Sequence, residues 1–250
     1  MSALLRVEGL AKRFGGLQAV DALSFELEEG AILGLIGPNG AGKSTVFNLI
    51  DGVIAPDAGR IVLRGADITG NPPYRVARMG LARTHQIVQP FANLTVLENC
   101  SVGACFGREE LPLARARMAA REAAVLVGLG EQLEAQAAQL TIAGKKRLEL
   151  ARALAARPTL LLLDEVLAGL NPTEVERMTG IIRTIRAGGV SILMIEHLMQ
   201  AIMSLSDRIV VLNSGAKLAE GTPAEVAADA AVIEAYLGDP GLAESLREAR

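Results

Sequence analysis

The sequence has little of two features that would restrict its class, cysteine and net charge. It contains only two cysteines, Cys100 and Cys105, with no further Cys or His nearby. They are too few for a disulfide framework and incomplete as a metal site, so reduced, inert cytoplasmic thiols are the simplest interpretation. The formal net charge is -3 and there is no basic tail, which gives no sign of a dedicated nucleic-acid surface.

Long apolar runs are also missing. The runs AILGLIG (31–37) and TLLLL (159–163) are far shorter than the ~20 residues that a membrane-spanning helix needs. The opening MSALLRVEGL lacks a charged segment followed by a long apolar one, so we expect no secretory signal. The chain is therefore expected not to span a membrane by itself, although it could dock on one through partners.

What the sequence does contain points to a sizeable core. Half of its 250 residues are hydrophobic and 21% are charged, which favours an ordered fold over disorder. LSFELE (23–28) alternates apolar and polar residues, as a half-buried strand does, and LLRVEGL (4–10) and GRIVLRG (59–65) resemble it more weakly. These early segments predict an antiparallel sheet beside the core. Four other runs are apolar on both faces, as buried parallel strands are: AILGLIG (31–37), TLLLLDE (159–165), VSILMIE (190–196) and DRIVVLN (207–213).

Helical patterns fall between these four runs, so an α/β fold with a parallel-rich sheet and crossover helices is the simplest architecture. The stretch 114–139, rich in Ala, Arg, Glu and Leu, predicts helices interrupted around Gly128 and Gly130. We expect it to form an inserted helical subdomain. Two helix starts are well marked, because 171–174 (Asn-Pro-Thr-Glu) and 222–225 (Thr-Pro-Ala-Glu) each offer an N-cap, a proline and a glutamate at N3.

A glycine-rich segment carries the strongest motif. GPNGAGKST (37–45) matches G-x-x-x-x-G-K-[ST], follows an apolar strand pattern and precedes a possible helix. Its glycines let backbone N–H groups curl around phosphate oxygens, and a helix N-terminus favours negative charge. Lys43 is expected to reach the β- and γ-phosphates, and the Ser44 hydroxyl to coordinate Mg²⁺. The chain is therefore predicted to bind a nucleoside phosphate; the alternative is a glycine-rich turn that matches by chance.

Two adjacent carboxylates end one of the buried strand patterns. Asp164 is suited to hold the Mg²⁺ shell, as the Walker-B aspartate of a P-loop protein does. Glu165, one residue on, could orient and deprotonate water for attack on the γ-phosphate. The alternative is a solvated acidic pair, which would leave the metal required by the P-loop without this partner.

With these motifs in order, the chain resembles the ATP-binding cassette (ABC) ATPase family over nearly its whole length. The resemblance implies that Phe14 in KRFGG stacks on adenine, that Gln86 in ARTHQ senses Mg²⁺ and the attacking water, and that His197 in MIEHLM contacts the γ-phosphate. A core aromatic, a surface glutamine and a helix cap are the respective alternatives. The implied catalytic residues are Lys43, Gln86, Glu165 and His197, and the implied metal site is Ser44, Gln86 and Asp164. The implied nucleotide-binding set is Phe14, Val20, Gly37, Pro38, Asn39, Gly40, Ala41, Gly42, Lys43, Ser44, Thr45, Thr141, Gly144 and Asn171.

The family signature, Leu-Ser-Gly-Gly-Gln, is altered here. It aligns with LTIAG (140–144), in which Thr141 keeps a hydroxyl while Ile142 and Ala143 replace glycines and Gly144 arrives one position late. Lysines follow in the first helical turn, where the helix dipole disfavours cations. One interpretation is that Thr141, Gly144 and the first-turn N–H groups still meet the γ-phosphate of a partner subunit, with Lys145 or Lys146 supplying charge. The other is a degenerate site in a dimer with one strong and one weak ATPase site.

The closest resemblance is to ATPase subunits of bacterial importers for branched-chain and other hydrophobic amino acids, whose relatives carry urea or short amides. It rests on segments such as RFGGLQAV (13–20), RLELARAL (147–154), AGLNPTE (168–174) and VIEAYLG (232–238). The resemblance implies ATP and Mg²⁺ as cofactors and a place on the cytosolic face of the inner membrane. The implied partners are a second ATPase subunit in a heterodimer or homodimer, two permeases and, indirectly, a periplasmic or extracellular solute-binding protein, with no nucleic acid.

The resemblance also places a permease-binding groove near IVQPFANLTVL (87–97), with Val88, Phe91 and Leu94 as candidate contacts or, alternatively, as subdomain core. It divides the chain into a single ABC ATPase domain at 1–240, made of a core at 1–88 and 146–240 and a helical subdomain at 89–145, followed by a tail at 241–250. Two other functions stay open, namely a soluble ABC ATPase acting on nucleic acid or ribosomes and a weakly hydrolysing regulatory cassette. The transported solute and the identity of the partner ATPase do not follow from the sequence.

Overall fold

The computed structural model describes residues 3–86 and 88–236. The chain forms two units, residues 1–73 together with 191–250, and residues 74–190, and each is described separately. The boundaries expected for the helical subdomain, 89–145, stay a prediction, and the expected tail at 241–250 lies outside the described residues.

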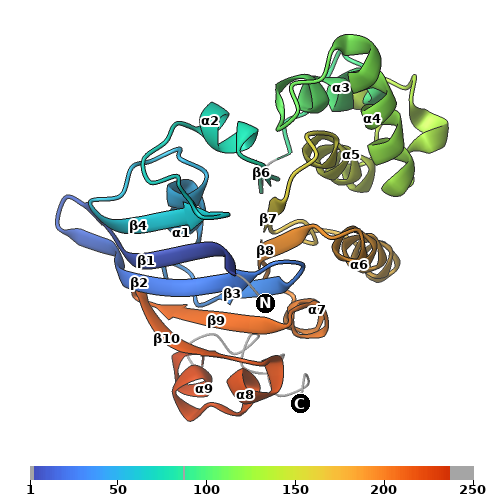
Figure 1. The fold of residues 1–250 in the computed structure, drawn as a ribbon. Coiled ribbons are helices and arrows are strands. Elements are labelled where there is room, and N and C mark those ends of the chain that lie inside the picture. The colour runs from blue at the N-terminus through green and yellow to red at the C-terminus, as the bar shows by residue number, and fades with distance from the viewer. Residues whose placement is uncertain (1–2, 87, 237–250) are drawn as a thin grey trace. The chain divides into compact units, whose positions relative to one another are not determined.

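The first unit begins with an antiparallel sheet of four strands in the order β2-β1-β4-β5. The long strands β1 and β2 pair with Val7 opposite Phe25, and Val7 also lies opposite Ile61 of β4 (Figure 1). Leu23, Phe25 and Leu27 are buried while the residues between them are more exposed, so the alternating pattern at 23–28 correctly predicted a half-buried strand. The strand bounds are β1 (Ala3–Phe14), β2 (Leu17–Glu28), β4 (Ala58–Leu63) and β5 (Ala66–Asp67).

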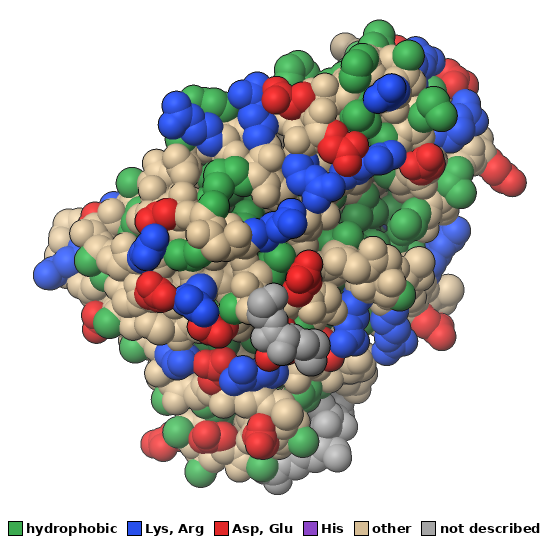
Figure 2. Space-filling model, viewed as in Figure 1, with side chains coloured by type: hydrophobic (Ala, Val, Ile, Leu, Met, Phe, Trp, Pro, Cys, Tyr) green, Lys and Arg blue, Asp and Glu red, His purple; other side chains and the backbone are tan. Residues whose placement is uncertain are grey.

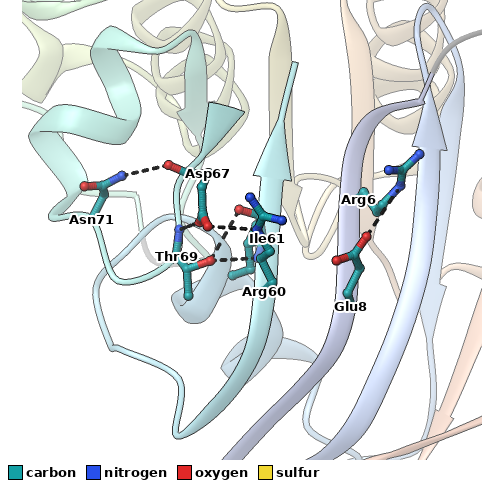
Figure 3. Close-up of polar contacts among 7 residues, drawn as sticks. All are labelled: Arg6, Glu8, Arg60, Ile61, Asp67, Thr69 and Asn71. Carbon is teal, nitrogen blue, oxygen red and sulfur yellow. Dashed lines mark hydrogen bonds and ion pairs between the residues drawn. The ribbon is translucent and has the colours of Figure 1, made fainter. Parts of the chain in front are cut away.

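A cluster of polar contacts holds the β4–β5 hairpin (Figure 3). The Arg60 Nε donates to Asp67 Oδ2 at 2.8 Å, and the Thr69 N–H donates to Asp67 Oδ1 at 2.9 Å. The Thr69 hydroxyl oxygen in turn accepts the Ile61 N–H at 2.9 Å. The Thr69 hydroxyl and N–H, followed by Arg60, lower the pKa of Asp67 to about 2.

The second sheet of this unit has the order β10-β9-β3-β8. β3 is buried along its whole length and runs parallel to both β8 and β9, whereas β10 pairs with β9 in the antiparallel sense. Runs that are apolar on both faces therefore correctly predicted central parallel strands. The elements are β3 (Ile32–Ile36), α1 (Lys43–Ile50), β8 (Ser191–Ile195), α7 (Met199–Leu205), β9 (Arg208–Asn213), β10 (Ala216–Gly221), α8 (Pro223–Ala228) and α9 (Ala230–Tyr236).

The second unit contains one parallel strand pair and a group of helices. β6 pairs with β7, with Leu81 opposite Leu160, and α3, α4 and α5 pack against one another (Figure 1). In the 114–139 stretch the helix predicted before Gly128 is confirmed as α4, which is followed by a left-handed Gly128 and then by two short 3-10 turns. The elements are α2 (Pro73–Arg78, starting one residue before the unit), β6 (Leu81–Arg83), α3 (Val96–Phe106), α4 (Leu113–Leu126), η1 (Gly130–Gln132), η2 (Ala137–Gln139), α5 (Ile142–Ala155), β7 (Leu160–Asp164) and α6 (Pro172–Ala187).

The two predicted helix starts have the expected caps. The Asn171 side chain accepts the Glu174 N–H at the start of α6, and the Glu174 carboxylate accepts the Asn171 N–H in return. Thr222 and Glu225 form the same reciprocal pair at the start of α8. These capping boxes satisfy N–H groups that a helix start otherwise leaves without partners.

The charged side chains of one face and the two cysteines can be located in the structure. On the face drawn in Figure 2, Lys and Arg side chains are interspersed with Asp and Glu. Cys100 and Cys105 are both free thiols, and burial raises the pKa of Cys100 to about 12, so this thiol stays protonated and unreactive. Among the helices of residues 3–86 and 88–236, none has the length and apolar character needed to cross a bilayer.

Candidate functional site

The segment between β3 and α1 has the backbone that the phosphate-binding motif requires. Gly40 and Gly42 have φ values of 80° and 101°, a region that side-chain-bearing residues rarely adopt. A Cβ added to Gly42 would collide with the carbonyl oxygen of Ala19, and one added to Gly37 would collide with that of Leu212. The loop therefore lies directly against neighbouring backbone, where only glycine fits.

Lys43, the first residue of α1, lies inside this loop. Its Nζ donates to the carbonyl oxygens of Gly37 at 2.6 Å and Pro38 at 3.1 Å, and the residue is only 7% exposed. The ammonium is thus held in the loop at the helix N-terminus. Loop N–H groups and a helix N-terminus also favour anions, so all three groups would attract the same negatively charged ligand. Ser44, next along the helix, is exposed. This arrangement can receive a chain of phosphates.

The remaining motif residues are anchored by their backbone. The Ala41 N–H donates to Pro38 O at 3.1 Å, and Ala41 O accepts the Gly215 N–H at 3.1 Å. Asn39 is exposed and Thr45 half-buried. The loop is therefore fixed both internally and to the turn between β9 and β10.

Three other sequence-predicted residues lie in the same unit. Phe14 ends β1 and is 48% exposed, with the Lys12 Nζ 5.7 Å from its ring centroid; an exposed ring suits stacking better than the alternative of a core aromatic. Val20 is fully buried in β2, so its side chain has no surface to offer a nucleotide. His197 follows β8 and is half-buried, and the N-cap of α7 is Leu198, without a side-chain cap bond. The capping alternative for His197 therefore has no support.

In the second unit, Asp164 ends β7 and its carboxylate is engaged. Arg83 Nη2 donates to Asp164 Oδ2 at 2.7 Å, and both side chains are more than nine-tenths buried. The Asp164 N–H donates to the Thr84 hydroxyl oxygen at 3.2 Å. The sequence reasoning missed Arg83, although a cation three residues before Gln86 was visible.

Glu165 is the residue predicted to orient and deprotonate the attacking water. Its backbone has a φ of 51°, which is uncommon for a residue with a side chain and costs on the order of 1–3 kcal/mol. The Gln86 Nε2 donates to its Oε2 at 2.6 Å. The structure therefore brings together two residues that are 79 positions apart, with the glutamate partly exposed and able to meet water.

A further carboxylate, that of Glu149, is buried in the same unit. Glu149 of α5 is 3% exposed; its Oε1 accepts the His85 N–H at 2.9 Å and lies 3.7 Å from the Arg152 Nη2. Burial raises its pKa, although the His85 N–H, Arg152 and Lys146 lower it. His85 thus contributes its backbone N–H to this contact. Arg152 also lies over the ring of Phe91, 5.8 Å from its centroid.

The expected permease groove is only partly described. Ile87 lies outside the described residues, Phe91 is 49% exposed, and Val88 and Leu94 are half-buried. The docking role of this segment stays a prediction.

The altered signature lies at the start of α5. Thr141 is the N-cap and its hydroxyl accepts the Gly144 N–H at 3.1 Å. A small cavity of about 80 Å³ is lined by Thr141 together with Leu170 and Glu174 from the start of α6. The Asn171 side chain is occupied by its capping bond. The roles of Thr141, Gly144 and Asn171 toward a nucleotide stay predictions.

The two signature lysines differ. Lys145 is half-exposed, whereas Lys146 is 8% exposed and its Nζ donates to the carbonyl oxygens of Glu165 at 3.0 Å and Val166 at 3.2 Å. Lys146 is the fifth residue of α5, so it lies just beyond the first turn in which the sequence predicted it, and its charge has partners inside its own unit. For Lys146 a phosphate is not needed to explain the charge.

Comparisons with known proteins agree with these motifs. Residues 20–168 match the ABC transporter family, and residues 216–241 match the branched-chain amino acid ATP-binding cassette transporter family. The high-affinity branched-chain amino acid transport ATP-binding protein LivG of Salmonella typhimurium is 44% identical, over 94% of this chain and 98% of that protein. The corresponding protein BraF of Pseudomonas aeruginosa is 41% identical over the same shares.

A solved structure gives the same result for the fold. The crystal structure of the ADP conformation of MJ1267, an ATP-binding cassette of an ABC transporter, has a TM-score of 0.87 and 31% identity, and the match covers 96% of this chain and 100% of that one. The P-loop, the strand-end carboxylates and the α/β fold all lie within this coverage. The chain therefore belongs to the ABC transporter family, as one of its ATP-binding and ATP-hydrolysing cassettes.

Proposed function

We propose that this chain hydrolyses ATP with Glu165 as the general base. The P-loop amides and Lys43 bind the phosphates, Phe14 stacks on the adenine, and His197 contacts the γ-phosphate. The Glu165 carboxylate takes a proton from water as the water oxygen attacks the γ-phosphorus. The bond between the γ-phosphorus and the bridging oxygen breaks, which releases ADP and phosphate. The 2.6 Å bond between Gln86 and Glu165 supports this assignment, since it orients the carboxylate before substrate arrives.

The oxygen groups of this chain also suit Mg²⁺, which prefers hydroxyl, carboxylate and amide oxygens. Ser44, which is exposed at the loop, and Asp164 would hold it together with Gln86. Arg83 engages one Asp164 oxygen, which leaves the other for the metal shell. When bound, Mg²⁺ neutralises charge on the phosphates.

We further propose that the chain powers import of branched-chain or other hydrophobic amino acids, or related amides, from the cytosolic face of the inner membrane. The observation that carries this proposal is the match to LivG and BraF over 94% of the chain. The partners would be a second ATPase subunit, which we expect to be different from this chain, and two permeases, served by a solute-binding protein.

Complementation tests this function. A bacterial strain that lacks the ATPase subunits of its branched-chain importer would receive this chain with its neighbouring permease and ATPase genes, and uptake of labelled leucine would be measured. We expect uptake with the parent chain and none with Glu165→Gln. Uptake of urea or short amides instead of leucine would correct the substrate class, and ATP-independent uptake would overturn the role as motor.

A further inference from the structure

Lys146 is a buried cation whose ammonium lies beside the turn that carries Glu165, the proposed general base. Its ammonium donates to Glu165 O at 3.0 Å and to Val166 O at 3.2 Å, with 8% of the residue exposed. Burying an ammonium is unfavourable unless hydrogen bonds replace its water. Because both of these acceptors belong to one turn, the position of the lysine and the conformation of that turn depend on each other.

The turn after β7 needs such support. Glu165 has a φ of 51°, and strained backbone of this kind persists only where its surroundings hold it in place. Within the turn, Glu165 O accepts a long bond from the Ala168 N–H, 3.3 Å. The lysine supplies a shorter, charged bond to the same carbonyl.

We propose that Lys146 is a positioning residue for hydrolysis: by holding the carbonyls of Glu165 and Val166 it fixes the left-handed turn and directs the Glu165 carboxylate toward the attacking water. This inference rests on the proposed role of Glu165 as base. It assigns to this residue of α5 a function inside its own subunit, separate from any contact with a nucleotide on a partner.

Lys146→Met tests the proposal, because methionine keeps an apolar stem of similar length and removes the ammonium. In the assembled transporter we expect kcat for ATP to fall by about 10- to 100-fold, as a misplaced catalytic group causes, while KM changes by less than about twofold. Lys146→Arg, which keeps charged donors, should recover most of the loss. Lys146→Gln retains a donor and replaces the methionine variant if that variant does not fold.

Arg147→Met is the matched control. Arg147 lies on the same helix and its Nη1 also donates to a backbone carbonyl, that of Gly128 at 2.9 Å, but that carbonyl belongs to a different turn. We expect this variant to keep kcat within about twofold of the parent. An equal loss of kcat in the Arg147 and Lys146 variants would show a general effect on α5 and overturn the proposal.

A double-variant cycle separates this inference from the proposed function. If Lys146 acts through Glu165, adding Lys146→Met to Glu165→Gln should cause no further loss. A Lys146 variant with parental kcat, or one that raises KM alone as loss of a phosphate contact would, overturns the positioning role and leaves Glu165 intact. Full turnover by Glu165→Gln overturns the proposed base itself.

Discussion

Asp67 is an exposed carboxylate whose surroundings favour its charged form. Thr69 and then Arg60 lower its pKa from 3.8 to about 2. Because the pKa in the folded state lies below that in the unfolded state, Asp67 contributes stability above the unfolded pKa and loses it as pH falls through the folded one. We expect Asp67→Asn to be less stable than the parent near neutral pH, with the difference shrinking as pH falls from 3.8 toward 2.

Urea unfolding of both proteins at a series of pH values measures this difference. Asparagine keeps the size of the side chain and can still accept a hydrogen bond, so it removes mainly the charge. A stability difference that stays constant across the range would show that charge at Asp67 is not involved.

Gly42 should tolerate no side chain. Its φ is 101°, and an added Cβ would collide with the carbonyl oxygen of Ala19. We expect Gly42→Ala to weaken binding of a fluorescent ATP analogue by more than about tenfold, because the loop can no longer place its amides around phosphate. Gly16→Ala is the control, since no atom lies within 4 Å of the added Cβ there. Equal affinities of the two variants would contradict the role of the tight loop backbone.

Residues whose role depends on local spacing could be predicted from the sequence, and residues whose role depends on distant contacts could not. The glycines around Lys43 and the cap at Asn171 follow from neighbours within a few positions. Lys146 reaches carbonyls 19 and 20 positions away, and Arg83 pairs with Asp164 81 positions away. Hydrophobic periodicity does not reveal such pairs. The sequence therefore offers Lys145 or Lys146 only as a possible charge beside the γ-phosphate, and it gives no sign of the Arg83 pair.

Among the helices, α5 depends on a single cap at its start. The Thr141 hydroxyl accepts the Gly144 N–H, and no acidic residue occupies the first turn to favour the dipole. We expect Thr141→Ala to lower the free energy of unfolding by about 0.5–2 kcal/mol and Thr141→Ser to be close to the parent. Denaturant unfolding of the three proteins measures this; an alanine variant as stable as the serine variant would show that the cap contributes nothing.

Strand and helix types were predictable here because their patterns differ in kind. β3 and β7 are buried on both faces and show no alternation, whereas β2 alternates as a half-covered strand does. The helix starts at Pro172 and Pro223 were predictable from their caps. The 3-10 turns η1 and η2 were not, since three-residue helices are too short to show a period.

For the molecule as a whole, ligand binding and folding are linked. A nucleotide that binds only the folded chain stabilises it by RT ln(1 + [L]/Kd), about 2.7 kcal/mol at a concentration of 100 Kd. For a chain of this size we expect saturating MgATP to raise Tm by about 5–10 °C. Calorimetry measures the shift in the parent and in Glu165→Gln, which we expect to bind MgATP without hydrolysing it.

Lys43→Met supplies the contrast for this measurement. The Lys43 Nζ donates to the loop carbonyls of Gly37 and Pro38, so its substitution alters the loop and removes the cation that we propose meets the phosphates. Without nucleotide, we expect its Tm to lie within a few degrees of the parent; with MgATP, it should not rise. An equal rise in both proteins would place the nucleotide somewhere other than the P-loop, because the stabilisation would then not depend on the proposed phosphate-binding lysine.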